Sequence, residues 1–282
     1  MLKYSLFLGC FIPAMQPFAE AAFRKISSIL GIELIDIKGA SCCPVSDVFG
    51  IVSYDAWVNI AARNMSLAEE INGDIVVLCN GCWDTFSSVL KKLVEDDNLL
   101  NKVNNNLSLL GRKFTGKLKV KHYLEVLVED IGLEKVQENV KIPLNLNIAM
   151  QYGCKLYRDN RLLKYFDELI EVIGAKKVFY DAERLCCGYP LSLYSQDLAF
   201  SERTKRKIDS IIKAEVDCIA VACPACFYYL EEGELNLIKS GYKCNIPILH
   251  LSELIALSFG FKPSEIGGSL HKIGYMNILG GR

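Results

Sequence analysis

The chain has 282 residues, of which 51% are apolar and 23% are charged, and its net charge is -1. These values are typical of a packed globular protein, and a chain of this length holds two ordinary domains. The small net charge gives no reason to expect a nucleic-acid partner, and charged residues interrupt the apolar stretches too often for a membrane span.

The first half of the sequence alternates predicted strands and helices. Apolar runs predict strands at 3–9, 32–37 and 74–78, and helical spacing predicts helices at 18–30, 54–71 and 82–96. Pro13 and Pro17 predict an irregular turn after the first strand. Five cysteines follow these elements: Cys10 at the end of the first strand, Cys42 and Cys43 after the second, Cys79 where the third ends, and Cys82 at the start of a helix.

The second half repeats this order. Strands are predicted at 145–152, 176–180 and 218–222, and helices at 161–173 and 195–215. Five cysteines occupy the same places, each 144 residues after its counterpart: Cys154, Cys186, Cys187, Cys223 and Cys226. Both copies read C-x31-CC-x35-C-x2-C. The pattern predicts an α/β fold of two duplicated, pseudo-symmetric domains, each with a Rossmann-like parallel sheet flanked by helices.

Three features outside the repeat bear on the domain organisation. The boundary is predicted near Pro143, which gives domains at 1–143 and 144–282. The pair His122 and Glu125 matches His250 and Glu253 at a shorter offset, so we assign an insertion in the first half to residues 98–117. The glycine-rich tail after residue 260, ending in Gly280-Gly281-Arg282, is expected to be ordered only against a partner.

The cysteines predict the chemistry. The first ten residues carry one charge and an apolar run too short for a secretion signal, so we expect a cytoplasmic protein. Disulfides are disfavoured in that compartment, so 12 cysteines indicate metal binding or redox chemistry. In a parallel sheet the carboxyl ends of the strands meet at one edge, which should bring each set of five together.

The number of cysteines per set bears on the kind of centre. Structural zinc takes four ligands, and adjacent cysteines rarely both fit one tetrahedral ion. A cubane four-iron cluster also takes four cysteines. Five cysteines with an adjacent pair favour a multi-iron cluster of unusual shape in each half. Zinc, and structural or thioredoxin-like redox thiols, are the alternatives.

Several stretches give the chain a family resemblance. They are FLGC at 7–10, GASCCP at 39–44, IAARNMSLAEE at 60–70, CNGCW at 79–83, Cys186-Cys187-Gly188 and CPAC at 223–226. The chain resembles the CCG-domain proteins over nearly its whole length, and more closely the B subunits of methanogen heterodisulfide reductase. Two departures are visible: Pro44 stands in place of the glycine in the first copy, and Gly188 is followed by Tyr-Pro-Leu-Ser-Leu where a glycine-rich run is expected.

That resemblance implies a catalytic iron-sulfur subunit in methanogenesis. It implies two non-cubane 4Fe-4S clusters, one held by Cys10, Cys42, Cys43, Cys79 and Cys82 and the other by Cys154, Cys186, Cys187, Cys223 and Cys226. The disulfide of coenzyme M and coenzyme B is expected to be cleaved between the clusters. The implied electron donors are the two other subunits of the reductase, one flavin-containing and one ferredoxin-like.

Other functions compete with this interpretation. A non-catalytic electron-transfer subunit, as in the CCG-containing subunits of some succinate or fumarate reductase complexes, would use the duplication only as a two-cluster wire. A zinc-stabilised interaction module is a third class. Cleavage of the heterodisulfide with reduced viologen would distinguish the first class from the second, and metal analysis would expose the third.

Weaker candidates carry two interpretations each. Lys155 and Arg158 follow Cys154 and are predicted either to bind anionic groups of a substrate or to form a solvated helix face. His122 and His250 either donate to a cluster sulfur or thiolate, or cap a strand end. The basic run 203–207 is predicted to be solvated surface or a docking patch, and Cys218 and Cys244 to be ordinary buried cysteines.

Overall fold

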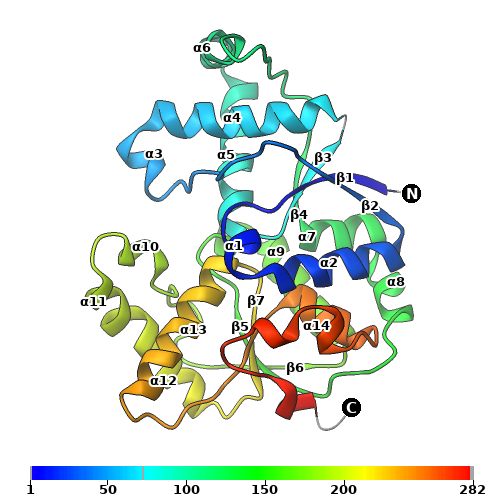
Figure 1. The fold of residues 1–282 in the computed structure, drawn as a ribbon, viewed down its shortest axis with the longest axis vertical. Helices are drawn as coiled ribbons and strands as arrows, with labels where there is room; N and C mark the ends of the chain where they lie inside the picture. Colours follow the sequence, from blue (N-terminus) through cyan, green and yellow to red (C-terminus); the bar gives the residue numbers. More distant parts are fainter. Residues whose placement is uncertain (1, 72, 280–282) are drawn as a thin grey trace. The chain divides into compact units, whose positions relative to one another are not determined.

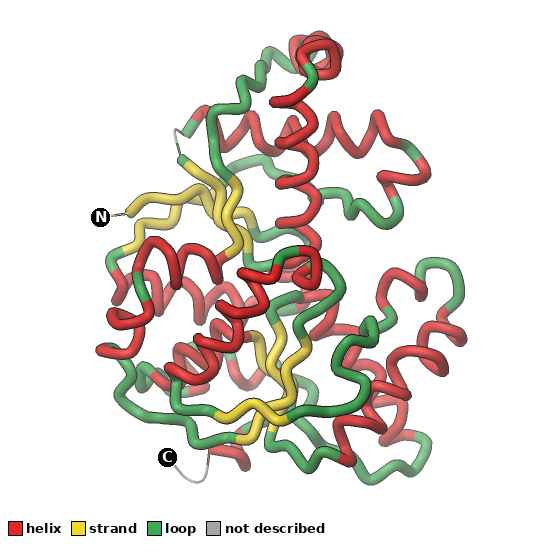
Figure 2. Tube along the Cα trace, turned by 180° about the vertical axis from the view of Figure 1, so that it is seen from behind, coloured by secondary structure: helices red, strands yellow, loops and turns green. Residues whose placement is uncertain are grey.

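The structure, a computed structural model that describes residues 2–71 and 73–279, contains two four-stranded sheets in which every pairing is parallel (Figures 1 and 2). The first has the order β2-β1-β3-β4, from β1 (Leu2–Phe7), β2 (Ile32–Asp36), β3 (Asp74–Val77) and β4 (Val120–His122). The second has the order β6-β5-β7-β8, from β5 (Asn147–Gln151), β6 (Lys176–Val178), β7 (Cys218–Val221) and β8 (Ile248–His250). The predicted duplicated α/β fold is confirmed.

The strand order places a switch point in each sheet. The chain runs from β1 outward to β2 and then returns to β3 on the other side of β1, and β5, β6 and β7 do the same. At such a point the connections leave in opposite directions, which opens a crevice beyond the carboxyl ends of the two central strands. Phe7 pairs with Val77, and Gln151 with Val221, so the two sheets have the same register at this edge.

The chain divides into two compact units that do not follow the repeat. Unit 1 contains residues 1–10 and 31–126, and unit 2 contains residues 11–30 and 127–282. In unit 1 the first sheet is accompanied by α3 (Phe49–Val52), α4 (Tyr54–Glu70), α5 (Asn80–Glu95), α6 (Asp97–Ser108) and α7 (Tyr123–Glu125). All residues of α6 except Asp97 fall in the predicted insertion, and Asp96 caps this helix by accepting a hydrogen bond from the backbone of Leu99.

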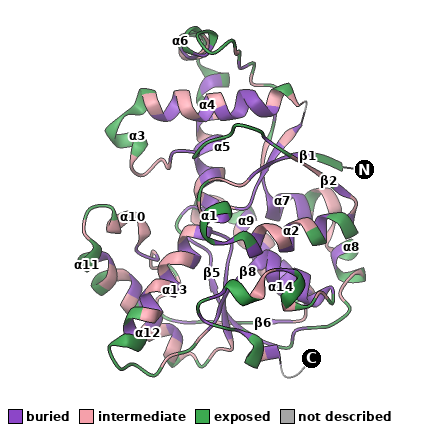
Figure 3. Ribbon diagram, in the orientation of Figure 1, coloured by how far each residue is buried: buried purple, intermediate pink, exposed green. Residues whose placement is uncertain are grey.

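Unit 2 holds more helices. Its helices are α1 (Phe11–Met15), α2 (Pro17–Leu30), α8 (Leu133–Glu138), α9 (Asn160–Val172), α10 (Tyr189–Ser192), α11 (Gln196–Ala199), α12 (Arg206–Lys213), α13 (Pro224–Lys239) and α14 (Leu251–Ser258), with the π-helices η1 (Val126–Ile131, whose first residue belongs to unit 1) and η3 (Phe200–Lys205) and the 3-10 turns η2 (Leu156–Arg158), η4 (Pro263–Glu265), η5 (Gly268–Leu270) and η6 (Met276–Leu279). The strands β5, β7 and β8 of its sheet are largely buried, whereas the edge strand β6 is not (Figure 3).

The crossover helix α2 packs within unit 2. Ser252 at the start of α14 donates to the carbonyl of Ala19, and Lys135 in α8 donates to the carbonyl of Leu30. The residues of α1 and α2 come from the first sequence repeat but pack in unit 2, so the packing of these two helices does not follow the repeat. A division at Pro143 into 1–143 and 144–282 therefore stays a prediction about the repeats rather than a description of the packing.

Three local predictions were wrong. Residues 11–15 form the helix α1 instead of an irregular turn, and Pro17 starts α2, where a missing N–H costs nothing. The single helix predicted at 195–215 is interrupted by the π-helical η3, where the Thr204 hydroxyl bonds to the Ala199 carbonyl. The tail needs no partner as far as residue 279: Ile273 and Tyr275 are buried in this chain, and Gly280-Gly281-Arg282 lie outside the described residues.

Candidate metal centres

Two of the five cysteines in each half lie on a strand-to-helix connection. Cys79 occupies the N-cap position of α5 without a capping hydrogen bond from its side chain, and Cys82 lies in the first turn of that helix. Cys223 and Cys226 occupy the same places in α13. The backbone of the two caps is nearly identical, with φ and ψ of -135° and 125° at Cys79 and -139° and 120° at Cys223. The positive end of the helix dipole favours thiolate at these positions.

The first cysteine of each set follows the other central strand through a glycine. Gly9 has φ +69° and Gly153 has φ +78°, a region that favours glycine. A Cβ at Gly9 would lie only 3.0 Å from Sγ of Cys82. Glycine therefore lets Cys10 leave β1 while the backbone stays close to the sulfur of a second cysteine, where a side chain on residue 9 would be crowded.

The adjacent pair is held by side chains from the neighbouring helices. In unit 1 the Asn64 amide donates to the Cys42 carbonyl at 3.0 Å, and Thr85 donates to the Pro44 carbonyl at 3.1 Å. In unit 2 Thr204 donates to the Cys187 carbonyl at 2.8 Å. The loop carrying each pair is thus fixed by hydrogen bonds to its own backbone.

The structure brings each set of five thiols together in the same order. Sγ of Cys42 lies 3.9 Å from Sγ of Cys10, and hydrogen bonds continue from Cys42 through Cys43 and Cys82 to Cys79. The second set runs in the matching order Cys154, Cys186, Cys187, Cys226 and Cys223.

This thiol chemistry is reflected in the pKa values. Hydrogen bonds from Cys42 and Cys82 hold the pKa of Cys43 well below its usual range, and those from Cys154 and Cys187 do so for Cys186. Cys82 donates a hydrogen bond to Cys43, and Cys154 donates one to Cys186. These hydrogen bonds raise the pKa values of Cys82 and Cys154, and burial raises them further. Each set therefore contains one cysteine whose thiolate form is favoured, and thiolate sulfur is a ligand that soft metal ions prefer.

Burial gives each set an open side. Cys10, Cys42 and Cys154 are exposed, whereas the sulfurs deeper in the two sets, those of Cys43, Cys82, Cys187, Cys223 and Cys226, belong to buried residues. None of the twelve cysteines, all within the described residues, forms a disulfide. Across residues 2–71 and 73–279, no three histidine, cysteine or carboxylate side chains converge as they would on one metal ion. A multi-iron cluster does not need such convergence, because its thiolate ligands are spread over several iron ions. The donor set of each half, five cysteine thiols, fits such a cluster in its chemistry, because cysteine thiolates are the usual ligands of iron-sulfur clusters.

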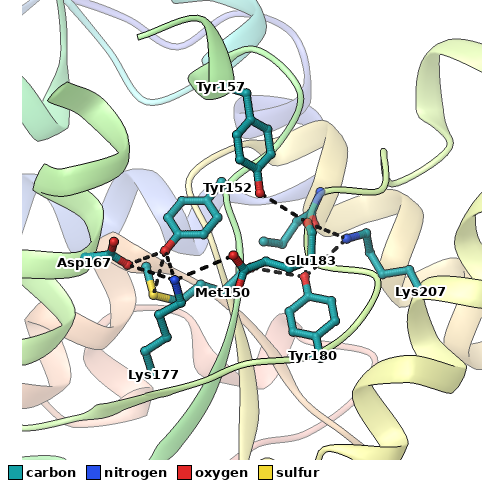
Figure 4. A network of polar contacts seen from close by, with 9 residues as sticks. Met150, Tyr152, Tyr157, Asp167, Lys177, Tyr180, Glu183 and Lys207 are labelled. Atoms are coloured by element: carbon teal, nitrogen blue, oxygen red, sulfur yellow. Dashed lines mark hydrogen bonds and ion pairs between the residues drawn. The ribbon is translucent and has the colours of Figure 1, made fainter. Parts of the chain in front are cut away.

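Unit 2 also holds a polar network that sequence reasoning missed (Figure 4). The Lys207 ammonium is fully buried and donates to the carbonyls of Ala182 at 2.6 Å and Glu183 at 3.1 Å, and to the Tyr180 hydroxyl at 3.2 Å. Loss of hydration lowers the pKa of Lys207 to about 8. The prediction that run 203–207 is solvated surface was therefore wrong for this lysine. A signal was available, since Lys207 lies 144 residues after Arg63, which donates to the Gly39 carbonyl at the matching place.

A second part of the network surrounds Tyr152 (Figure 4). Its hydroxyl pairs closely with the Asp167 carboxylate and accepts a hydrogen bond from Lys177 at 2.7 Å. Burial, the bond to Asp167 and its negative charge raise the pKa of Tyr152. The hydroxyl therefore stays protonated at any physiological pH.

The weaker candidates have mixed outcomes. Lys155 is buried directly after Cys154, so the solvated-face interpretation is wrong for it, while Arg158 is exposed at the end of η2. His122 and His250 occupy matching places and cap α7 and α14: each ring accepts a backbone N–H, and Glu125 and Glu253 complete the two capping boxes. Cys218 is buried as predicted, and Cys244 is half-buried.

His271, which no sequence motif singled out, is also held by contacts within unit 2. Its Nε2 is 2.7 Å from the Glu253 carboxylate, with both side chains buried, and its ring stacks on Phe18 of α2 at 4.1 Å. It therefore ties the tail to α14 and α2 within unit 2. No helix in the described part of the chain has the length and apolar character needed to cross a membrane.

Several known proteins are similar to this chain in sequence. Residues 4–87 and 148–231 each match the cysteine-rich domain, CCG. The chain is 36% identical over 277 residues to the B subunit of the ferredoxin:CoB-CoM heterodisulfide reductase of Methanosarcina mazei, covering 95% of this chain and 92% of the relative. It is 28% identical over 277 residues to the "8-methylmenaquinol:fumarate reductase membrane anchor subunit" of Wolinella succinogenes, covering 94% of this chain and 95% of the relative.

A solved structure shares the fold. The crystal structure of a hypothetical protein from Helicobacter pylori superposes with a TM-score of 0.77 at 16% sequence identity. The match covers 96% of this chain and 52% of that chain, so this chain spans about half the length of the solved relative. The duplicated parallel-sheet architecture is therefore also found at very low sequence identity.

Proposed function

Because the chain belongs to the family of heterodisulfide reductase B subunits, with two copies of the cysteine-rich CCG domain and the iron-sulfur clusters that this family indicates, we propose that it is the subunit that cleaves the disulfide. The resemblance stated from the sequence is confirmed at the level of the family. The relatives are named as subunits, so the chain works within a larger assembly. The substrate proposed is the coenzyme M–coenzyme B disulfide that those names carry.

The proposal assigns one non-cubane 4Fe-4S cluster to each half. The thiols of Cys10, Cys42, Cys43, Cys79 and Cys82 would hold one, and those of Cys154, Cys186, Cys187, Cys223 and Cys226 the other. The observation that carries this assignment is the repeated order of sulfur contacts, because it presents five thiols from three different connections in the same way twice. Such clusters would supply one-electron transfer and iron sites with affinity for thiolate sulfur.

The reaction consumes two electrons and two protons and breaks the S–S bond of the disulfide, which leaves as two thiols. In the assembly the electrons are proposed to come from two partner subunits, one flavin-containing and one ferredoxin-like. The chain's own residues prepare each site: Cys10 in the first set and Cys154 in the second are exposed and leave their own set accessible to a small molecule, while the deeper cysteines of each set are buried away from water. Lys155 and Arg158, beside Cys154, are proposed to bind anionic groups of the substrate. We place the protein in the cytoplasm, a reducing compartment in which the cysteines stay available as cluster ligands.

The deciding experiment uses the full chain, purified without oxygen. We expect each chain to contain the iron and sulfide of two 4Fe-4S clusters and little zinc. We also expect the protein to reduce the heterodisulfide with reduced viologen as the electron donor. Addition of the disulfide should also change the electron paramagnetic resonance (EPR) spectrum of the oxidised protein. Colourless, zinc-containing material would contradict the cluster assignment, and iron-loaded protein without turnover would contradict the catalytic role.

A second function is favoured by one comparison. The relative in Wolinella succinogenes matches over 94% of this chain and is named as part of a fumarate reductase. A non-catalytic electron-transfer subunit would hold the same clusters and accept electrons from viologen. It would show no spectral response to the heterodisulfide and no thiol product, and this pair of readouts separates the two functions.

A further inference from the structure

A buried amide reaches one of the proposed cluster ligands in unit 2. Gln151 is the last residue of β5, is 1% exposed, and directs Nε2 at Sγ of Cys226 at a distance of 3.6 Å. An amide N–H is a true donor, and sulfur accepts such bonds at this length. When Cys226 is a thiolate the bond is charge-assisted and becomes stronger.

The orientation of this amide is set by its neighbours. The Tyr180 hydroxyl has one proton, which it shares between the Met150 carbonyl at 3.1 Å and Oε1 of Gln151 at 3.4 Å. Because the oxygen end of the amide faces a donor, the nitrogen end must face the sulfur. Lys207 in turn donates to the Tyr180 hydroxyl, and both side chains belong to the polar network of unit 2 (Figure 4). A buried hydrogen-bond chain thus runs from a cation through a phenol and an amide to a cysteine sulfur.

The matching chain cannot exist in unit 1. The residue 144 positions before Gln151 is Phe7, whose backbone pairs with β3 as Gln151 pairs with β7. Phe7 has no donor group and packs edge-on against Phe86 with ring centroids 4.6 Å apart. The residue matched with Tyr180 is Asp36, at the exposed end of β2. One set of five cysteines therefore receives an amide donor at this place, and the other receives an aromatic ring.

We propose that Gln151 makes the second cluster easier to reduce than the first, with Tyr180 and Lys207 as the residues that position its amide. Reduction adds negative charge to a cluster and its thiolates. An N–H donor to a ligand sulfur and a buried cation nearby both stabilise that added charge, which raises the reduction potential. An arriving electron then rests preferentially on the half that contains Gln151. This inference rests on the proposed function only through the assignment of Cys226 as a cluster ligand.

The test is an anaerobic redox titration of the full cluster-loaded chain, followed by EPR. The signal lost in Cys226→Ala identifies the second cluster, and we expect it to have the higher midpoint potential in the unaltered protein. In Gln151→Leu we expect its reduction equilibrium to become about tenfold less favourable, which is about 59 mV for a one-electron couple. Tyr180→Phe, which keeps the ring, should shift the same signal in the same direction by less.

Two controls separate tuning from damage. Tyr152→Phe removes a neighbouring hydroxyl that bonds to Asp167 and Lys177 instead of Gln151, and it should leave both midpoints unchanged. Phe7→Leu changes the matching position in unit 1 without adding or removing a donor, and it should leave the second cluster's midpoint unchanged. Unchanged midpoints in both Gln151→Leu and Tyr180→Phe, at full iron content, would overturn the inference while leaving the proposed function intact. An unaltered chain that holds no second cluster would overturn both, and the iron analysis would show which case applies.

Discussion

The two cysteine-rich halves share a scaffold and differ in what surrounds it. Both place a glycine and a cysteine after the first strand and a cysteine at the N-cap position of a helix. In both, a basic side chain on a neighbouring helix donates to a backbone carbonyl of the loop that carries the adjacent pair. This side chain is Arg63 in one half and Lys207 in the other. Unit 1 fills the remaining space with Phe7, Phe86 and other apolar side chains, whereas unit 2 buries lysine, tyrosine and glutamine. Duplication thus fixed where the sulfurs lie and left their electrostatic environment free to diverge.

The glycine of the CCG sequence should show the largest difference. Gly188 has φ +109°, and a Cβ there would lie 2.7 Å from the Thr204 hydroxyl and 3.0 Å from the Ala199 carbonyl. We expect Gly188→Ala to lower the free energy of unfolding by about 2 to 5 kcal/mol, from backbone strain and overpacking together. Pro44→Ala at the matching position should cost only about 0.4 to 1 kcal/mol. Urea denaturation of both variants measures the contrast, and equal losses would contradict it.

A buried carboxylate should make unit 2 sensitive to pH. Burial raises the pKa of Glu234 from 4.5 to about 7, and its Oε2 is buried without a hydrogen-bond partner among the described residues. The matching residue in unit 1 is Leu90. Between these two pKa values the folded state keeps a proton that the unfolded state has lost. The free energy of unfolding should therefore fall as the pH rises from about 4.5 to 7, by up to about 3 kcal/mol.

Glu234→Gln tests this dependence. An amide keeps an acceptor for the backbone N–H of Ile246 but carries no charge at any pH. Thermal unfolding between pH 5 and 8 should show a flatter profile for the variant and a higher stability than the unaltered chain at pH 8. A variant with the same slope as the unaltered chain would show that other groups carry the effect.

The insertion of unit 1 should depend on one amide. Asn104 in α6 donates to the Phe114 carbonyl at 3.0 Å and accepts from its N–H at 2.8 Å, and the Phe114 side chain is fully buried. We expect Asn104→Ala to cost about 1 to 3 kcal/mol, because both backbone groups lose their partner. The neighbouring Asn105→Ala is the control, with little effect expected. Hydrogen exchange should show the loss of protection confined to residues near 114.

The smallest effect concerns substrate affinity. Phe11 and Lys155 occupy matching positions directly after Cys10 and Cys154, so only the second half offers a cation there. In Lys155→Met we expect the apparent KM for an anionic disulfide to rise about tenfold, equivalent to about 1.4 kcal/mol, with kcat little changed. An uncharged disulfide should show no such rise. Equal KM values for the anionic disulfide in the variant and the unaltered chain would remove Lys155 from the binding site.

Sequence reasoning recovered the parts that repeat. A fixed offset of 144 residues identified both sets of five cysteines, and strand and helix periodicity gave the order of the elements. The matched His122 and His250 were found from a similar motif at a shorter offset, and both cap helices. It failed where residues depend on distant neighbours: Lys207 lies in a run of charges typical of a surface, yet it is fully buried because three oxygen atoms accept its hydrogen bonds.

The sequence by itself thus determined the duplicated α/β fold and the two sulfur sets, because these follow from local periodicity and spacing. It also indicated the family, because short stretches around the cysteines carry the resemblance. Only the tertiary structure decided that α2 packs in unit 2, in what order the thiols touch, and that Gln151 points at Cys226. The physical reason is that burial and hydrogen-bond partners are set by segments far apart in the chain. Gln151, Tyr180 and Lys207 each look ordinary in the sequence, and they acquire a role only where β5, the loop after β6 and α12 meet.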